Sequence, residues 1–351
     1  MCPKNEELKS ADVKSFAESV GFDIVRITSA EPFTQYEKNV KNRASKGLIP
    51  SDVGDWEDLQ ILQQPGFYSQ PANTLTDAKS IISLAVNYYL QGEKDASQLG
   101  NPCARIARSY WRCFYPDASE RAGKVAAYLR AHGIKVAEGH IVPDKLVAVR
   151  AGVGWYGKNG VVQTTRFGSW IILRSLITNA KMEEDEELKN DCGTCEACII
   201  ACPTSAIVAP YVVDVGRCVN YFSVRKGDIP ENLRGLMGNH IACCDDCLEA
   251  CPKNKKVTPT LRQVKPIRVS YGTSPSLISL LRVTEKEFQK EFYDLDWAEP
   301  KLKYLLRDVA VALGNSEDKS VISHVNKLLK NPDETVRNHA SWAAKKLSMA
   351  T

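Results

Sequence analysis

Eight of the twelve cysteines fall into two sets that have the spacing of iron–sulfur ligands. The first set is the run Cys192-x2-Cys195-x2-Cys198-x3-Cys202-Pro203, which is typical of bacterial ferredoxins. The second set is Cys244-x2-Cys247-x3-Cys251-Pro252, with Cys218 in the place of a missing first ligand. In two-cluster ferredoxins the cysteine before the proline binds the other cluster. We therefore predict two [4Fe–4S] clusters.

The exchange of these last cysteines divides the eight ligands between two cubes. The predicted ligands of cluster one are Cys192, Cys195, Cys198 and Cys251. The predicted ligands of cluster two are Cys202, Cys218, Cys244 and Cys247. Zinc is the alternative metal, but structural zinc sites usually join separated Cys-x2-Cys pairs through four ligands. The paired Cys-Pro ends favour iron–sulfur clusters, which would conduct electrons.

We expect reduced thiols, because the N-terminal MCPKNEELKSADVK has no apolar core of a secretory signal. No apolar stretch approaches the roughly 18 residues of a membrane span, so we expect a cytoplasmic protein without a membrane partner. Apolar residues make up 44% and charged residues 25%, as in ordinary globular proteins. The net charge is +4, but residues 252–351 hold 18 basic and 11 acidic side chains. The basic excess therefore belongs to the C-terminal part.

Residues 1–182 precede the cysteine sets and are predicted to form an α/β domain. Apolar residues recur at helical spacing over 13–20, and longer apolar runs predict strands at 23–28, 80–89, 134–137 and 170–178. Between the strands we expect helices over 118–132 and 146–151. Residues 34–79 are predicted to be a long loop with short helices. Strands that alternate with helices favour a layered domain.

Two further domains are predicted after this one. Residues 183–262 would form a ferredoxin-like domain, and the acidic run 183–187 is interpreted as a solvated linker or a first helical turn. Residues 263–351 are predicted to be helical, with a capping box at Thr284 and Glu287 and apolar stripes over 302–313, 321–329 and 336–347. The segment NPDETVRNHASWAAKKL resembles a HEAT repeat, whose helix pairs stack into curved surfaces. The alternative is a helical domain that only covers the cluster region.

Over nearly its full length the chain resembles the epoxyqueuosine reductase family. The segments that carry the resemblance run in family order: AKSIISLAVNYY, RAGVGWYGKNG, FGSWIILRSLIT, CGTCEACIIACPTSAIVAPYVVD, RCVNYFSVRKGDIPENLRGLMGN, CCDDCLEACPKN, LLRDVAVALGNS and DETVRNHASWAAKKL. The resemblance implies a cobalamin- and iron–sulfur-dependent reductase that completes queuosine in tRNA. Reductive dehalogenases share the plan of a cobalamin domain and a ferredoxin domain, but they lack the HEAT-like tail and are a more distant match.

The resemblance implies that the first domain holds cobalamin base-off, with no protein ligand to cobalt. The corrin is expected near GWYGKNG and FGSWIIL, with the chain at Cys244 and Asp245 closing over it from the cluster side. The residues expected to bind the cofactor are Lys158, Asn159, Val162, Ser169, Leu173, Tyr221, Cys244 and Asp245. The clusters would reduce the cobalt to Co(I), and an epoxide oxygen would leave as an alkene forms.

The resemblance also implies a carboxylic acid that protonates the departing oxygen. An ungapped count back from Arg150, in the Arg-Ala-Gly element, places Glu138 where the family has an aspartate. Asp144, Tyr110 and Tyr115 are the alternatives. The family's Ser/Thr-Ala/Gly-Pro after that aspartate is absent, and its ARYARGxDYH stretch is ARIARSYWRCFYPD in this chain. The substrate therefore stays open between epoxyqueuosine on tRNA and another compound with a reducible C–O or C–halogen bond.

The resemblance sets the expected partners. An external donor of the flavodoxin or ferredoxin type would supply electrons, and tRNA is a further expected partner. Three basic residues on the HEAT-like helices allow tRNA binding: Arg337, Lys345 and Lys346. We expect a monomer. The alternatives to an enzyme are a non-catalytic electron carrier and an RNA-binding module with structural clusters.

Overall fold

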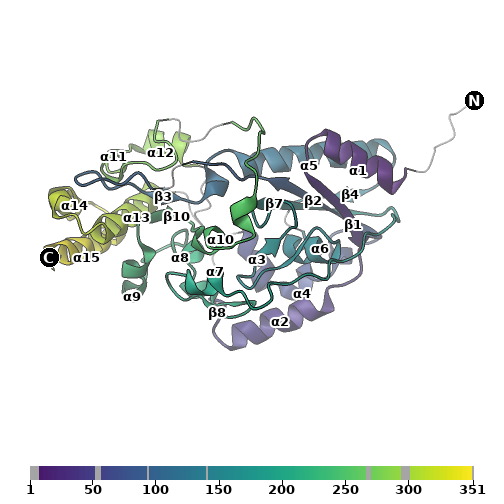
Figure 1. Ribbon diagram of the computed structural model, residues 1–351, viewed down its shortest axis with the longest axis horizontal. Helices are drawn as coiled ribbons and strands as arrows, with labels where there is room; N and C mark the ends of the chain where they lie inside the picture. Colours follow the sequence, from purple (N-terminus) through teal and green to yellow (C-terminus); the bar gives the residue numbers. More distant parts are fainter. Residues whose placement is uncertain are drawn as a thin grey trace, which may run out of the picture.

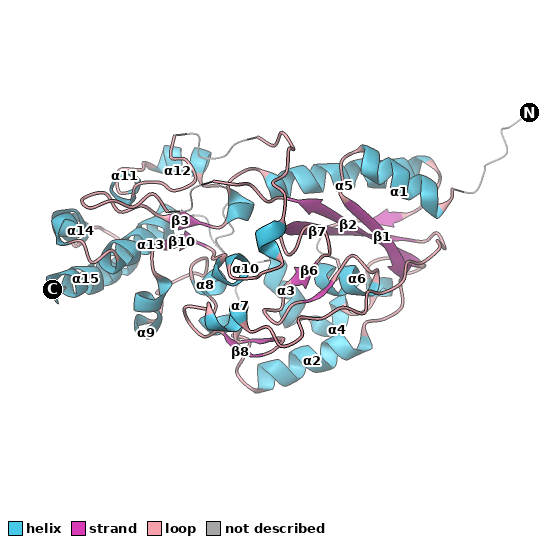
Figure 2. Ribbon diagram, viewed as in Figure 1, coloured by secondary structure: helices cyan, strands magenta, loops and turns pink. Residues whose placement is uncertain are grey.

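The computed structural model describes residues 8–51, 57–92, 95–139, 141–265, 270–293 and 301–349 (Figure 1). Its first part contains a sheet with the strand order β1–β2–β7–β4 (Figure 2). These strands are β1 (Ile24–Ser29), β2 (Ser80–Asn87), β7 (Ile171–Thr178) and β4 (Val136–Ala137). The predicted strands are thus confirmed, with small shifts at their ends. Each neighbouring pair is antiparallel, so this part of the chain is α+β.

Helices cover both faces of the sheet. They are α1 (Ser10–Ser19), α5 (Phe114–Ala131) and α6 (Asp144–Arg150). Leu84 of β2 joins the buried cluster formed with α1 and α5, whereas Ile81 of β2 and Ile177 of β7 pack against Val147 of α6. Because both faces are covered, every residue of β2 is buried, which explains why the strand lacks the polar–apolar alternation of a half-exposed strand. Figure 1 shows α1 and α5 above the strands and α6 below them.

The segment between β1 and β2 is more helical than predicted. It contains α2 (Thr34–Ser45), α3 (Glu57–Gln63) and α4 (Pro65–Tyr68). Val40 is buried on α2, and the other residues of this helix are partly or fully exposed. A helix with so little buried apolar surface lacks the stripe by which sequence periodicity detects helices.

Four residues of the acidic run 183–187 are exposed, as the solvated interpretation predicts, but Asp185 is partly buried and binds β1. The carboxylate of Asp185 accepts the backbone N–H of Ile27 at 2.8 Å and pairs with Lys14 at 2.7 Å and with Arg26 at 3.0 Å. Burial acts to raise the pKa of Asp185, but these hydrogen bonds outweigh it and lower the pKa. The run therefore lies along β1, held by basic side chains that are remote in sequence.

The cysteine-rich segment is built from short elements. They are α7 (Ala197–Ile200), β8 (Ile207–Ala209), β9 (Val212–Val213), α8 (Val219–Phe222), α9 (Glu231–Arg234), β10 (His240–Ala242), α10 (Asp246–Glu249) and the 3₁₀ turn η5 (Asn254–Lys256). β10 pairs in parallel with β3 (Arg105–Ile106), which belongs to the first part of the chain. This pairing fixes the segment 105–111 beside the second cysteine set.

The C-terminal part is helical, as predicted. Its helices are α11 (Leu277–Leu280), α12 (Glu285–Glu291), α13 (Leu302–Asn315), α14 (Ile322–Leu328) and α15 (Glu334–Met349). The capping box at Thr284 and Glu287 is confirmed, and Asp333 caps α15 by accepting the backbone N–H of Thr335 at 2.9 Å. Apart from Leu329, which is 39% exposed, the three apolar stripes lie in or against one core, which also contains Ile106 and Trp111. The domain boundaries and the HEAT assignment stay predictions. Among the described helices, none is long and apolar enough to cross a membrane.

Candidate iron–sulfur and cofactor site

The structure brings together the four cysteines predicted for cluster one. Burial raises the pKa of the Cys198 thiol, and the charges of Cys192, Cys251 and Cys195 raise it further. Cys198 lies on α7 and Cys251 follows α10, so the group joins two segments that are distant in sequence. Four thiolates at such short range repel one another, and a positively charged iron–sulfur core would relieve that repulsion. The donor set therefore fits a [4Fe–4S] cluster.

The four cysteines predicted for cluster two are also neighbours. Burial raises the pKa of the Cys218 thiol, and the charge of Cys202 raises it further. Burial also raises the pKa of Cys247, and the charges of Cys218 and Cys202 raise it further. Burial likewise raises the pKa of Cys244, which has Cys247 as a charged neighbour. The same argument from thiolate repulsion applies to this set. The assignment of each ligand stays a prediction.

The two sets differ in their surroundings. Cys195 of the first set is exposed. In the second set, Cys218 and Cys244 pack against an apolar cluster that includes Phe222 and Met237. Cluster one would thus have one ligand at the surface, and cluster two would have an apolar cluster on one side.

Backbone N–H groups point at two sulfurs of the second set. Ala206 donates to Sγ of Cys202 at 3.2 Å, and Asp246 donates to Sγ of Cys244 at 3.5 Å. Hydrogen bonds to cysteine sulfur are one of the means by which proteins set the reduction potential of an iron–sulfur cluster. These contacts would therefore influence cluster two.

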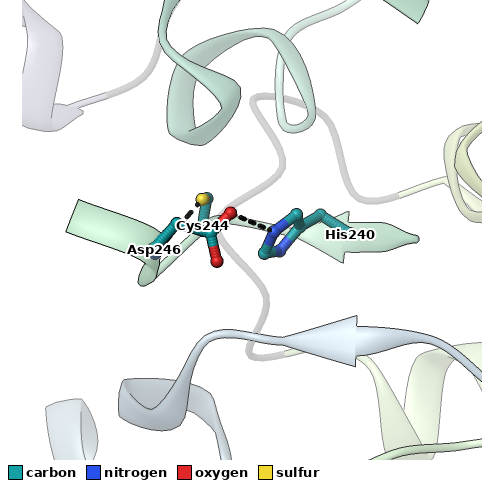
Figure 3. A group of neighbouring side chains, drawn as sticks. All are labelled: His240, Cys244 and Asp246. Atoms are coloured by element: carbon teal, nitrogen blue, oxygen red, sulfur yellow. Dashed lines mark hydrogen bonds and ion pairs between the residues drawn. The ribbon is translucent and has the colours of Figure 1, made fainter. Parts of the chain in front are cut away.

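His240, Cys244 and Asp246 form a compact group whose potential ligand atoms lie within 4.8 Å of one another (Figure 3). Oδ2 of Asp246 lies 3.1 Å from Nε2 of His240, and Arg105 donates to Oδ1 of Asp246 at 2.6 Å. Burial acts to raise the pKa of Asp246, but His240 and Arg105 outweigh it and hold the pKa well below its usual range. Because Cys244 belongs to the second cysteine set, we interpret this group as support for that ligand.

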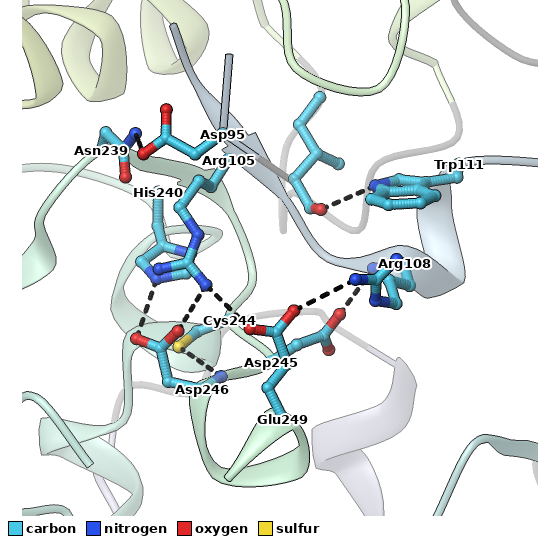
Figure 4. Close-up of polar contacts among 11 residues, drawn as sticks. Asp95, Arg105, Arg108, Trp111, Asn239, His240, Cys244, Asp245, Asp246 and Glu249 are labelled. Atoms are coloured by element: carbon cyan, nitrogen blue, oxygen red, sulfur yellow. Dashed lines mark hydrogen bonds and ion pairs between the residues drawn. The ribbon is translucent and has the colours of Figure 1, made fainter. Parts of the chain in front are cut away.

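A polar network continues from this group to Arg108 (Figure 4). Asp245 accepts the backbone N–H of Arg108 at 2.6 Å, and Glu249 lies 3.4 Å from both Arg105 and Arg108. Burial raises the pKa of Asp245 to about 6, although the hydrogen bond from Arg108 opposes the shift. Arg105, Arg108, Asp245 and Glu249 line a pocket beside the second cysteine set. The other residues that line this pocket are Ile106, Ala107, Trp111 and His240.

The residues expected to bind cobalamin lie mostly around the second cysteine set. Lys158 and Asn159 occupy the turn between β5 (Trp155–Tyr156) and β6 (Val162–Gln163), and Asn159 forms a hydrogen bond that lowers the pKa of Cys247 against the dominant effect of burial. The side chain of Lys158 is only 8% exposed, and its ammonium group has no partner among the described residues. The ammonium group itself still reaches solvent, so it could donate to a ligand that brings hydrogen-bond acceptors.

The other expected cofactor residues are also placed by the structure. Val162 and Leu173 pack in one apolar cluster under the β5–β6 turn. Oγ of Ser169 accepts the amide of Asn254 at 2.7 Å, which leaves the hydroxyl proton of Ser169 available to donate. Tyr221 is buried on α8, three residues after Cys218.

The candidate proton donors do not gather at one point. Glu138 forms an ion pair with Arg130 at 2.8 Å at the exposed edge of the sheet. Asp144 is half-buried at the start of α6. Tyr110 is buried, and its ring centre lies 5.4 Å from that of Tyr115. The proton donor stays a prediction.

Comparisons with known proteins agree with this geometry. A family model described as a 4Fe-4S double cluster binding domain matches residues 191–254, which supports iron–sulfur clusters over zinc. The epoxyqueuosine reductase of Lactococcus garvieae is 31% identical over 291 residues, which cover 79% of this chain and 81% of the relative. The chain belongs to the epoxyqueuosine reductase family. Family membership makes it an oxidoreductase.

Solved structures of epoxyqueuosine reductases have the same fold as this chain. One structure, of an epoxyqueuosine reductase with an epoxyqueuosine-modified tRNA-Tyr stem loop, has a TM-score of 0.86 and 27% identity and covers 96% of this chain and 89% of that one. A Bacillus subtilis epoxyqueuosine reductase, described with its catalytic aspartate loop swung out of the active site, has a TM-score of 0.86 and 26% identity and covers 96% and 90% of the two chains.

Two residues at the site of this epoxyqueuosine reductase family member escaped the sequence analysis. Tyr88 is buried at the end of β2, and burial followed by the nearby charges of Asp245, Tyr115 and Cys247 raises its pKa well above the usual value. Arg108 stacks on Trp111, with 4.4 Å between the guanidinium carbon and the ring centre. Neither residue belongs to a spaced motif. The signal that could have found Arg108 is its match to the second arginine of the family's ARYARG element.

Proposed function

We propose that this protein reduces epoxyqueuosine in tRNA to queuosine. The observation that carries the proposal is the contact of the second cysteine set with the first domain, where Asn159, beside the mostly buried Lys158, forms a hydrogen bond with Cys247. The reaction takes up two electrons and two protons, breaks both C–O bonds of the epoxide and releases water as the alkene forms. The two-cluster arrangement supports delivery of those electrons one at a time.

Cobalamin is the proposed second cofactor, and the residues present fit it. The ammonium of Lys158 has no partner among the described residues, and the same part of the chain provides no acceptor for the buried Nε1 of Trp170. The amide groups of a corrin would supply such acceptors. Lys158, Asn159 and Ser169 would hold those amides, Val162 and Leu173 would shape the apolar floor, and Tyr221, Cys244 and Asp245 would approach from the cluster side. When bound base-off, cobalamin supplies a reducible cobalt centre suited to cleaving a C–O bond.

The buried polar network would orient substrate and cofactor. Arg108 is fixed by three contacts: its side chain donates to the carbonyl of Leu90 at 2.8 Å, stacks on Trp111 and lies near Glu249. Its backbone N–H holds Asp245. A cation and a carboxylate fixed in this way provide a rigid polar wall that keeps water out of the reaction site.

tRNA is the proposed macromolecular substrate, which places the protein in the cytoplasm. The basic excess of the C-terminal part supports it. Of the three basic residues expected to take part, Lys345 is exposed. Arg337 donates to the carbonyls of Asn331 and Pro332, and Lys346 lies 2.5 Å from Oδ1 of Asn315, so both of these also stabilise the fold. Weakening of tRNA binding by salt would report such phosphate contacts.

Cofactor dependence tests the proposed function. Protein reconstituted anaerobically should hold about eight irons, as two four-iron cubes require, and should turn over epoxide-bearing tRNA only when cobalamin is also present. Lys158→Met should weaken cobalamin binding roughly 10–100-fold, the value of a hydrogen bond from a charged group, without loss of iron. Lys189→Met, which removes an exposed lysine, is the matched control. Full turnover without cobalamin, or unchanged cobalamin binding by Lys158→Met, would contradict the proposal.

A further inference from the structure

The first cysteine set has an exposed apolar surface beside it. Ile200 ends α7, between the cluster-one ligand Cys198 and Cys202, and is 82% exposed. Val208 and Tyr211, on the adjoining β8–β9 hairpin, are each 46% exposed. α7 and β8 are in contact and lie together in Figure 1. An exposed isoleucine flanked by further exposed apolar side chains is typical of a surface that binds another protein.

Three exposed lysines lie near the same cysteine set, and one of them, Lys253, lies 5.1 Å from the ring centre of Trp155. Lys253, Lys255 and Lys256 follow the cluster-one ligand Cys251 directly, on and before η5. η5 contacts α10, and α10 contacts α7, so the lysines and Ile200 belong to neighbouring elements. We call Ile200, Val208, Tyr211 and these three lysines the donor face.

The donor face carries a modest positive charge. Segments 188–218 and 252–257 hold five basic side chains: Lys189, Arg217, Lys253, Lys255 and Lys256. They hold three acidic ones: Asp191, Glu196 and Asp214. The excess is concentrated in the lysines of the 252–257 segment, which has no acidic residue. A partner with an acidic rim and an apolar centre would complement this surface, because opposite charges speed encounter and buried apolar area stabilises the complex.

We propose that the donor face docks a small acidic one-electron carrier protein, which reduces cluster one. This inference rests on the proposed function, because only a reductase needs repeated delivery of electrons. In each encounter the carrier loses one electron and cluster one gains it, and cluster one then passes the electron to cluster two. Two encounters supply the two electrons of one turnover. The exposed position of Cys195 leaves cluster one within reach of a bound carrier.

Binding and cluster reduction by flavodoxin test the donor face. The variant Lys255→Glu with Lys256→Glu should bind reduced flavodoxin about tenfold more weakly in low salt, with a second-order rate of cluster reduction that falls by a similar factor. The difference should shrink at high salt, because screening removes the charge effect. Ile200→Ser should weaken binding at both salt concentrations. Iron content and reduction by methyl viologen should be unchanged in each variant.

Matched variants elsewhere on the surface show whether flavodoxin binding depends on the donor face itself or only on the overall charge and exposed apolar area of the protein. Lys124→Glu with Lys286→Glu makes the same charge change on α5 and α12, and Leu261→Ser removes another exposed apolar side chain. These controls should bind flavodoxin normally. Equal effects of test and control variants, or donor-face variants that bind and accept electrons normally, would overturn the inference. Loss of tRNA affinity with unchanged flavodoxin binding would overturn it too and would make this face a nucleic-acid surface.

The same experiment separates the inference from the proposed function. If methyl viologen drives turnover of the modified tRNA in every variant, the proposed function holds and the flavodoxin data alone judge the donor face. If methyl viologen drives no turnover in the cofactor-loaded wild type, the proposed function fails whatever flavodoxin does.

Discussion

Nε2 of His339 on α15 accepts the backbone N–H of Ile229 at 3.0 Å. The other ring nitrogen lies 2.7 Å from the carbonyl of Thr335, so the ring is held as a neutral tautomer. Beside it, the fully buried guanidinium of Arg307 donates to the carbonyls of Ser223, Arg225 and Gly227. The C-terminal helices thus bind the backbone of the segment that follows Cys218 and Tyr221. We therefore expect the C-terminal helices to stabilise the backbone that carries Cys218 and Tyr221.

This contact predicts a loss of stability in acid. Burial lowers the pKa of His339 to about 4, with Arg234 and Arg307 as further lowering causes and Asp228 opposing them. The unfolded chain protonates this histidine near pH 6.5, so stability is fully present above about pH 6.5 and falls as the pH drops toward 4. The loss should reach roughly 3 kcal/mol.

Thermal unfolding of wild type and His339→Gln between pH 7.5 and 4 measures this effect. The variant should be less stable at neutral pH and should show a flatter dependence on pH, because its side chain does not titrate. Parallel curves for the two proteins would show that another group controls the acid response.

Asp246→Asn should shift the reduction potential of one cluster only. The substitution removes a negative charge beside Cys244, and reduction of a cluster adds negative charge, so the potential should rise. It also weakens the contacts with Arg105 and His240. Redox titration followed by electron paramagnetic resonance would resolve the two clusters, and Asp191→Asn is the control near cluster one. A shift of both clusters, or of the other one, would contradict the placement of Cys244 in cluster two.

Cys251→Ser should disturb cluster one despite its place in the second cysteine set. The reason is the grouping of Cys251 with Cys192, Cys195 and Cys198. We expect an altered or lost cluster, with about four irons retained by the other cube. Cys243→Ser, which changes a buried cysteine outside both sets, should keep all the iron. Full iron content and two unaltered spectra in Cys251→Ser would refute the assignment.

Glu138→Gln tests the predicted proton donor. If Glu138 is the acid, turnover should fall by roughly 10²–10⁴-fold while iron and cobalamin contents stay normal. In the structure Glu138 pairs with Arg130, so this role requires the segment to move toward the substrate. Arg130→Met is the control for loss of the ion pair alone. Normal turnover by Glu138→Gln, together with loss in Asp144→Asn or Tyr110→Phe, would assign the role to one of the alternatives.

The parts of the site that follow a spacing rule could be predicted from the sequence. The two ligand sets depend on intervals of two or three residues and on the proline after the last cysteine. In the structure the cysteines of each predicted set are electrostatic neighbours, and the ligand assignment stays a prediction. The strands and the C-terminal helices were predictable for a similar reason, because their buried faces repeat at fixed periods.

The rest depends on contacts between remote segments. Asp185 binds β1 through Lys14 and Arg26, and no local pattern distinguishes such a carboxylate from a solvated one. Arg108 and Tyr88 reach the site because β3 pairs with β10 and β2 lies at the centre of the sheet. Glu138 was assigned by counting back from Arg150 without gaps. Such a count does not allow for a loop that differs in length or direction from that of the family.

The most direct measurement is single-turnover reduction of a tRNA stem loop that carries epoxyqueuosine, with nucleoside products identified by mass spectrometry. Protein loaded with iron and cobalamin and reduced by methyl viologen should convert the modified nucleoside to queuosine, with loss of one oxygen atom. The same RNA without the epoxide should be unchanged. Epoxyqueuosine that remains intact in the presence of fully loaded, fully reduced protein would contradict the central claim.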